Sequence, residues 1–470
     1  MKRKMKFLYT PLLFFIITFS SCKKDYLDLE PYNGLPTSES ILNEDDMEIA
    51  LNGAYASLRS IALYGRTLPL FGDLAADNVY ISTTNSNRYL EYMYYTYTVS
   101  NGNARDMWQS AYATILYANN VINSTVAKSA VSDQLRGEAM AIRALMYFEL
   151  VKHFSKPYTV DANAIGVPIV LTYSPFVKPV RNSVSEVYAQ IKKDLDAAIP
   201  LMTIDKPTGY FSAAAAKGLR ARMHLFKGEW ALALTAATDV ITNSGYTLLP
   251  INQVLNYWAT NTPRNDGLET LFEVVFDLVG NANNDALAYF YSQDGGYGDA
   301  LAAQSLYNLY TASDVRKSLI LTSSPTRGNV RVVNKYPNAT QPDKDEFKVI
   351  RMSEVYLIAA EASFQSGNEG NARSYLNAVA TRRDAAFTGY VSTGAALLND
   401  ILLERRKELA FEGQRYWDLA RYNRDVVRVN LAGNYTGAPL TLPTANFRRI
   451  FPIPQTELDA NPNITQNPDY

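Results

Sequence analysis

The stretch YLIAAEASFQSGNEGNARSYLNAVA, residues 356–380, decides the fold class, because its pattern occurs twice in the chain. The earlier copy is AKGLRARMHLFKGEWALALTAATDVI, residues 216–241. An alignment without gaps matches Ala221 with Ala360, Leu225 with Phe364, Gly228 with Gly367, Ala233 with Ala372 and Val240 with Val379. Small residues let two helix surfaces approach closely, and a glycine permits a tight turn between two helices. Each copy therefore predicts two helices joined at its central glycine.

This spacing is typical of the tetratricopeptide repeat, in which helix pairs stack on their neighbours and bury a continuous core. The alternative is two unrelated antiparallel helix pairs that use alanine and glycine for the same packing reason. Both interpretations predict a body built of paired helices.

Three further segments have the apolar spacing of amphipathic helices. They are residues 106–124, 133–154 and 184–199. For the second, Ser132 or Asp133 is the expected N-cap, and the third should begin after Ser183 and stop at Pro200. The sequence thus predicts a mostly α fold with minor β structure.

Two long segments, residues 64–103 and 244–348, do not share this helical spacing. The first is rich in Tyr, Asn and Thr, and the second in Gly, Asn, Asp, Pro and Tyr. The helical body is expected at about 36–63, 104–243 and 349–470. Since long irregular insertions on a rigid scaffold commonly carry binding sites, we expect a ligand at the two insertions.

The N-terminus has the layout of a secretory signal, with basic residues before an apolar run at 7–19. The run is too short to span a bilayer, which takes about 20 apolar residues. Ser20 and Ser21 precede Cys22, the only cysteine in the chain. This resembles a bacterial lipoprotein signal, so we expect a signal peptide at 1–21, lipidation of Cys22 and a mature domain at 22–470. An ordinary signal with a bystander cysteine is the alternative.

The composition excludes several kinds of site. One cysteine permits no disulfide framework and no thiolate metal site in the mature chain, and we expect no metal and no cofactor. The two histidines lie in helical stretches, and no HExxH, GxSxG or phosphate-binding glycine motif is present. The 45 basic residues balance the 46 acidic ones, which gives no basic face for nucleic acid.

The strongest charged cluster is LLERRKELAFEGQRYWDLAR, residues 402–421. Glu404, Glu408 and Glu412 follow one another at steps of four, with arginines between them. Paired carboxylates can cleave a glycosidic bond, but neighbouring arginines lower carboxylate pKa values and favour ion pairing over proton donation. We interpret the cluster as structural and expect no catalytic residue.

Tyrosine is abundant, with 33 residues against 19 Phe and 4 Trp. A tyrosine offers a flat apolar face to the C–H side of a sugar and a hydroxyl for its rim, while Asn, Asp and Arg can pair with vicinal hydroxyls. The candidate ligand-binding residues are Tyr80, Asn87, Arg88 and Tyr89 in the first insertion, and Tyr289, Tyr291, Asp294 and Tyr297 in the second. For each of them, packing or a loop hydrogen bond is the alternative role.

Several stretches together resemble the SusD/RagB family of Bacteroidetes outer-membrane lipoproteins. They are GEAMAIRALMYFELVKHF (137–154), RMSEVYLIAAEASFQSGNEGNARSYLNAVATRR (351–383), ILLERRKELAFEGQRYWDLARY (401–422) and the tail IFPIPQTELDANPNITQNPDY (450–470). The resemblance runs from Cys22 to Tyr470, and the tail is its most specific part.

The resemblance implies a right-handed superhelical body of tetratricopeptide-like helix pairs, anchored by lipid to the outer membrane and facing the extracellular side. It implies a non-enzymatic protein that binds nutrient, an oligosaccharide in most members, and passes it to a SusC-like TonB-dependent transporter. The alternatives are a peptide-binding, RagB-like lid and a tetratricopeptide adaptor for another protein. A hydrolase is a third class, which the sequence scarcely supports.

Overall fold

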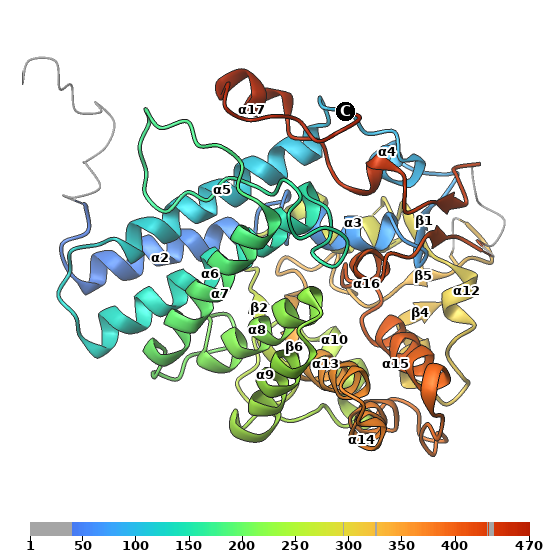
Figure 1. The fold of residues 1–470 in the computed structure, drawn as a ribbon. Helices are drawn as coiled ribbons and strands as arrows, with labels where there is room; N and C mark the ends of the chain where they lie inside the picture. The colour runs from blue at the N-terminus through green and yellow to red at the C-terminus, as the bar shows by residue number, and fades with distance from the viewer. Residues whose placement is uncertain (1–39, 295, 325–326, 430, 432–436) are drawn as a thin grey trace, which may run out of the picture. The chain divides into compact units, whose positions relative to one another are not determined.

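The computed structural model describes residues 40–294, 296–324, 327–429, 431 and 437–470 (Figure 1). The expected signal at 1–21 and Cys22 lie outside the described residues. The chain divides into two units, Met1–Ser40 and Ile41–Tyr470, and the description below concerns the second.

Long helices form the body of this unit. They are α2 (Glu44–Leu58), α5 (Gly102–Ile122), α6 (Ala130–Phe154), α7 (Val184–Ala198), α8 (Ala213–Lys227), α9 (Trp230–Asn243), α13 (Met352–Gln365), α14 (Glu369–Ala380) and α15 (Gly394–Glu408). Helices α5 to α9 each pack against the next in the chain, and α9 then packs against α13, which packs against α14 (Figure 1). The stack of helices therefore continues from α9 to α13, although a long segment of the chain separates these two helices. The body is a stack of neighbouring helices, as predicted.

The two similar stretches form helix pairs. In the first, Gly228 ends α8 with φ of +73°, and in the second, Gly367 follows α13 with φ of +82°. These left-handed conformations favour glycine, which explains why each turn carries one. The matched alanines Ala221, Ala233, Ala360 and Ala372 have no exposed surface. The small side chains therefore lie where helices meet, which confirms the prediction.

The helix starts follow local capping. Ser183 caps α7, and its capping box with Glu186 confirms the predicted start. The expected start of α6 at Ser132 or Asp133 is wrong, because Ser129 is the N-cap and Ser132 completes the box from the third helical position. Apolar spacing locates the buried face of a helix, but the polar first turn extends beyond it.

The two expected insertions contain only short elements within their described residues. In 64–103 these are α3 (Thr67–Leu74), β1 (Val79–Ile81) and α4 (Leu90–Tyr94). In 244–348 they include α10 (Val254–Ala259), β2 (Thr270–Val274), α11 (Leu287–Tyr291), β3 (Ala300–Ala302), α12 (Gln304–Tyr307), β4 (Ile320–Leu321), β5 (Val332–Val333) and the start of β6 (Phe347–Arg351). The described strands pair antiparallel as β1 with β3, β2 with β6, β4 with β5, and β7 (Val426–Val427) with β8 (Thr441–Leu442).

The C-terminal segment lies against the helical body. It contains α16 (Arg415–Arg421), which packs against α3, and the short α17 (Gln455–Ala460). Phe451 and Ile453, on either side of Pro452, are fully buried, while Asn461 donates a hydrogen bond to the backbone of Pro179. The tail is thus a docked strap with one short helix.

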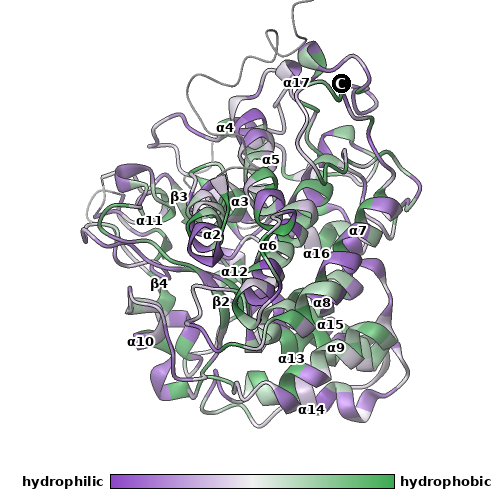
Figure 2. Ribbon diagram, turned by 90° about the vertical axis from the view of Figure 1, so that its left-hand side faces the viewer, coloured by the Kyte–Doolittle hydropathy of each residue, from purple (hydrophilic) through white to green (hydrophobic). Residues whose placement is uncertain are grey.

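Hydrophobic residues gather along α9 and α13 where these helices pack, whereas α7 and α14 carry hydrophilic stretches (Figure 2). Trp108 and Trp417 lie in the core and are at most 4% exposed. Within the described ranges, no helix combines the length and the apolar character that crossing a bilayer requires.

Candidate ligand-binding site

Strand pairing joins the two insertions. β1 and β3 are antiparallel, with Val79 opposite Ala302 and Ile81 opposite Ala300. The end of β1 therefore lies beside the beginning of β3, and the residues that follow β1 meet the residues that precede β3. Strand β3 in turn contacts β5 of the second insertion, and Figure 1 shows β1 on the same side of the molecule as β4 and β5. We call the region formed by residues 82–89, 283–294 and 296–298 the loop surface.

Arg88 is central to the loop surface. Its guanidinium carbon lies 4.3 Å from the centre of the Tyr297 ring and 5.6 Å from the centre of the Phe290 ring. Its Nη1 donates a hydrogen bond of 2.7 Å to Asp285 Oδ1, and its Nε donates to the Ser86 hydroxyl at 3.0 Å. Its Nη2 is buried and has no hydrogen-bond partner within the described residues. A guanidinium held this firmly keeps the Tyr297 ring and the Asp285 carboxylate in fixed positions beside each other.

Asp285 is shared between two arginines. Arg66, at the N-terminal end of α3, donates to the same Oδ1 at 2.7 Å, and also to the backbone carbonyl of Asp285 at 3.0 Å. Burial by itself would raise the pKa of Asp285, but the hydrogen bond and charge of Arg66, together with those of Arg88, outweigh it and lower the pKa. Asp285 is therefore a carboxylate at neutral pH and can accept hydrogen bonds from hydroxyl groups.

Arg327 and Asp299 hold the two loops together. Arg327 donates to the backbone carbonyl of Thr84 at 2.7 Å and to that of Tyr297 at 3.0 Å. Asp299 accepts hydrogen bonds from the backbone N–H of Ser86, at 3.0 Å, and from its hydroxyl. Each residue thus links one insertion to the other and fixes where Arg88 and Tyr297 lie.

Two tyrosines give the loop surface its aromatic part. Tyr297 is 37% exposed, Tyr289 is half-buried, and their ring centres lie 6.4 Å apart in an edge-to-face arrangement. Rings beside a guanidinium and a carboxylate provide an apolar face and hydrogen-bonding groups together, which suits a sugar. No group of three or more His, Cys, Asp or Glu residues suited to a metal ion occurs in the described part of the chain.

The eight candidate residues divide by exposure. The structure brings Arg88, Tyr289 and Tyr297 together, and Asn87 and Asp294 are exposed on the same two loops.

Tyr80, Tyr89 and Tyr291 are at most 2% exposed and are corrected to packing positions. Tyr80 lies within β1, and Tyr89 bonds through its hydroxyl to Arg66 and Thr67. Tyr291 stacks on Tyr336 with ring centres 6.2 Å apart. A ring without exposed surface offers no face to a ligand in this conformation.

Arg66, Asp285, Asp299 and Arg327 were missed from the sequence. The sequence prediction rested on clusters of tyrosine, whereas these charged residues lie singly in the two insertions. Their position inside the two insertions was the only signal that could have found them.

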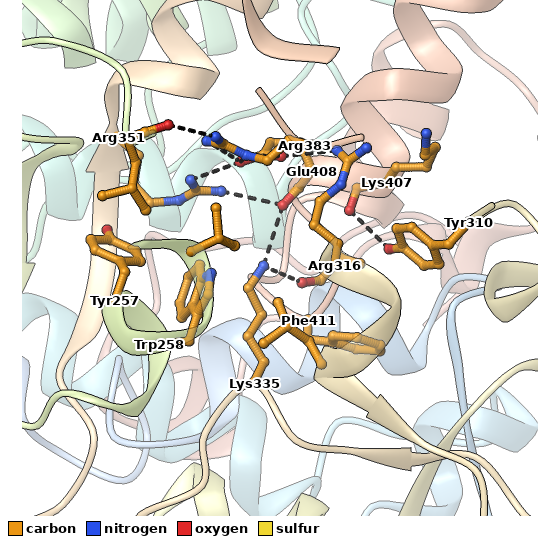
Figure 3. Close-up of a pocket in the computed structure, with 14 residues that line it drawn as sticks. Tyr257, Trp258, Tyr310, Arg316, Lys335, Arg351, Arg383, Lys407, Glu408 and Phe411 are labelled. Carbon is orange, nitrogen blue, oxygen red and sulfur yellow. Dashed lines mark hydrogen bonds and ion pairs between the residues drawn. The ribbon is translucent and has the colours of Figure 1, made fainter. Parts of the chain in front are cut away.

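The charged cluster of residues 402–421 is not a site of this kind. Its centre, Glu408, accepts hydrogen bonds from Arg316 at 2.9 Å, Arg351 at 3.1 Å and Arg383 at 3.1 Å (Figure 3). Burial would raise the pKa of Glu408, but the three arginines hold it well below its usual range. The adjoining cavity measures only about 10 Å³. A carboxylate that stays ionised and inaccessible suits a structural ion pair, which agrees with the prediction.

Comparison with known proteins gives the family. A SusD superfamily protein of known structure from Bacteroides thetaiotaomicron is 30% identical to this chain, covers 91% of it and is itself covered completely, with a TM-score of 0.84. The chain belongs to the SusD family. The model of the SusD family matches residues 304–470, and a second model, described as starch-binding associating with outer membrane, matches residues 25–225.

Two further relatives are similar to this chain. A SusD-like protein of Formosa agariphila is 27% identical over the full length of both chains. The starch-binding protein SusD of Bacteroides thetaiotaomicron is 32% identical over 133 residues, which is 28% of this chain and 23% of that protein. The SusD neighbours share the tetratricopeptide-like helical fold described above.

Proposed function

We propose that this protein binds an oligosaccharide at the loop surface and delivers it to a SusC-like TonB-dependent transporter. On this proposal it is a lipoprotein, anchored through Cys22 to the outer membrane, on the side that faces the extracellular medium. It binds without catalysing a reaction. The proposal adopts the domain division 1–21 and 22–470, with the insertions at 64–103 and 244–348 facing the ligand.

The arrangement of Arg88 over the Tyr297 ring, beside Asp285, carries the proposal. It joins a cation, a carboxylate and a partly exposed aromatic ring within hydrogen-bonding reach of one ligand. An oligosaccharide presents both C–H faces and hydroxyl groups, so one sugar residue can use all three features. One relative is named a starch-binding protein, which supports an oligosaccharide as the ligand. One matching family model is described as associating with the outer membrane, which supports the proposed location.

Calorimetry tests the proposal. The soluble form that starts at Lys23 is titrated with a panel of purified oligosaccharides and, separately, with a peptide digest. We expect saturable heat from at least one glycan and a loss of affinity of at least about tenfold in Tyr297→Ala, which corresponds to about 1.4 kcal/mol. Tyr173→Ala is the matched control, because Tyr173 is 63% exposed and lies in another loop.

The other outcomes separate the alternatives. Heat from the peptide digest alone identifies a peptide-binding lid of the RagB kind. Stable capture of a partner protein, without heat from sugars or peptides, identifies an adaptor. Release of product from a polysaccharide contradicts the absence of catalysis.

A further inference from the structure

A second hollow lies beside the C-terminal end of α2, outside the loop surface. Its volume is about 410 Å³, which falls at the small end of the range of roughly 300–1,000 Å³ typical of ligand pockets. Its lining includes Asn52, Tyr55, Arg59, Tyr210, Phe272 and Glu273. We call this hollow the α2 cavity.

The aromatic wall of the α2 cavity is held firmly. The Tyr55 hydroxyl donates to Glu138 at 2.8 Å and accepts from the backbone N–H of Phe211 at 2.8 Å. The Tyr210 ring meets the Tyr55 ring edge-to-face with centres 5.1 Å apart, and the Phe272 ring lies 6.4 Å from Tyr55. Phe272 belongs to β2, which is paired with β6. A wall fixed in this way loses little conformational entropy when a ligand binds.

The charged groups at the cavity are already paired. Glu273 accepts a hydrogen bond of 2.6 Å from Lys348, and Arg59 donates one of 2.8 Å to Asp277. A charged ligand would lose its hydration without gaining an unpaired counter-charge, which is costly. The cavity therefore favours a neutral ligand.

Hydrogen-bonding groups remain at the mouth. Asn52 is exposed and brings a carboxamide with donors and an acceptor. Arg59 is 27% exposed, and only its Nη1 takes part in the ion pair with Asp277. An apolar aromatic wall below a carboxamide and a guanidinium that is already ion-paired matches a molecule with a C–H face and a rim of hydroxyl groups.

One segment connects the α2 cavity with the loop surface. Asp277 is bound by Arg59 at the cavity, and Asp285 is bound by Arg66 and Arg88 at the loop surface. Residues 277–285 can span at most about 30 Å. Arg59 and Arg66 both belong to the connection between α2 and α3, so two neighbouring arginines hold the two ends of this segment.

We propose that the α2 cavity is a second carbohydrate subsite, which takes one neutral pyranose residue against the half-buried Tyr210 ring, which the buried Tyr55 ring supports. The inference rests on the proposed function, because it assigns the same ligand class to a separate place. The second subsite differs from the loop surface because it binds its ligand without Arg88 and Tyr297.

The test uses saturation-transfer NMR of the soluble form with the methyl glycosides of glucose, galactose, mannose and xylose, and with glucuronic acid. Asn52→Trp places an indole at the mouth of the cavity on an exposed helix position. Gly53→Trp is the matched control, since nothing lies within 4 Å of a Cβ at Gly53. Arg88→Ala disables the loop surface, and Tyr210→Ala removes one aromatic wall.

We expect a signal from at least one neutral glycoside in the wild type, in Gly53→Trp and in Arg88→Ala. In the Arg88→Ala background, the remaining signal should fall at least about fivefold when Asn52→Trp or Tyr210→Ala is added. A remaining signal that Asn52→Trp leaves unchanged overturns the inference, and so does a signal from glucuronic acid alone.

The two proposals fail in different ways. Oligosaccharide binding that is lost in Arg88→Ala and unchanged in Asn52→Trp overturns the second subsite and leaves the proposed function standing. An absence of binding to every sugar overturns both.

Discussion

The guanidinium carbon of Arg88 lies 4.3 Å from the centre of the Tyr297 ring, although the two residues belong to different insertions. The pairing of β1 with β3 and the hydrogen bonds of Arg327 make this contact possible. Arg66 also binds Asp285, so the loops stay connected when Arg88 is changed. The role of Arg88 in binding can therefore be separated from its role in the fold.

Arg88→Lys should weaken oligosaccharide binding at least about fivefold while the midpoint of thermal unfolding shifts by a few degrees at most. Lysine keeps the charge but loses the planar fork that lies over Tyr297 and reaches Asp285. Calorimetry and thermal unfolding measure the two quantities. Arg105→Lys, at an arginine whose side chain is 44% exposed, is the control and should change neither. Equal oligosaccharide affinity in Arg88→Lys and Arg105→Lys would show that Arg88 is not part of the binding site.

Glu408→Ala should lower the free energy of unfolding by about 3–5 kcal/mol. Arg316, Arg351 and Arg383 all donate to this carboxylate, and its removal leaves buried positive charge uncompensated. Urea unfolding measures the loss. Lys192→Ala breaks an exposed ion pair with Asp196 and should cost less than about 1 kcal/mol. A loss of that small size in Glu408→Ala would contradict a structural role for the cluster.

Gly72→Ala should destabilise the protein by about 2–3 kcal/mol or more. A Cβ at Gly72, in α3, would lie 1.9 Å from the backbone oxygen of Gly413, and backbone atoms cannot move aside as a side chain can. Gly53→Ala is the opposite case, because Gly53 lies in α2 with nothing within 4 Å of its Cβ. That variant should gain about 0.5–1 kcal/mol from its higher helix propensity. Urea unfolding measures the stability of both variants. An unchanged free energy of unfolding in Gly72→Ala would show that α3 and the turn at Gly413 can separate.

Stability should fall as pH rises because of Glu346. Burial raises the pKa of this carboxyl from 4.5 to about 8, and its Oε1 has no hydrogen-bond partner within the described residues. The folded state therefore keeps a proton that the unfolded state releases, so its contribution is complete below pH 4.5 and is lost as pH rises towards 8. Glu346→Gln, which stays neutral, should match the wild type near pH 4.5 and be more stable by about 2–4 kcal/mol near pH 8. Unfolding free energies measured across this range test the sign, and a difference that does not change with pH would refute it.

Cys22→Ala should abolish incorporation of labelled fatty acid and release the protein from the membrane fraction. Attachment through acyl chains gains about 0.8 kcal/mol for each buried methylene group, and the chain offers no other cysteine. Ser21→Ala is the control and should stay acylated. Continued membrane attachment of Cys22→Ala would show that Cys22 is a bystander of an ordinary signal.

The helical body and the structural role of the charged cluster could be predicted from the sequence alone. Helix pairs depend on the local spacing of residues. Alanines and glycines such as Ala360 and Gly367 therefore predict a helix pair whatever the rest of the chain contains. The arginines among Glu404, Glu408 and Glu412 likewise predicted ion pairs, because charge compensation depends on residue type more than on exact position.

Only the tertiary structure decided which polar and aromatic residues form a surface. Tyr80 and Tyr297 look equivalent in the sequence, yet a β-strand buries the first and a loop exposes the second. Arg66, Asp285 and Arg327 gained their roles because the pairing of β1 with β3 brought distant loops together. Contacts between residues far apart in the chain follow from packing, and local sequence patterns carry no information about them.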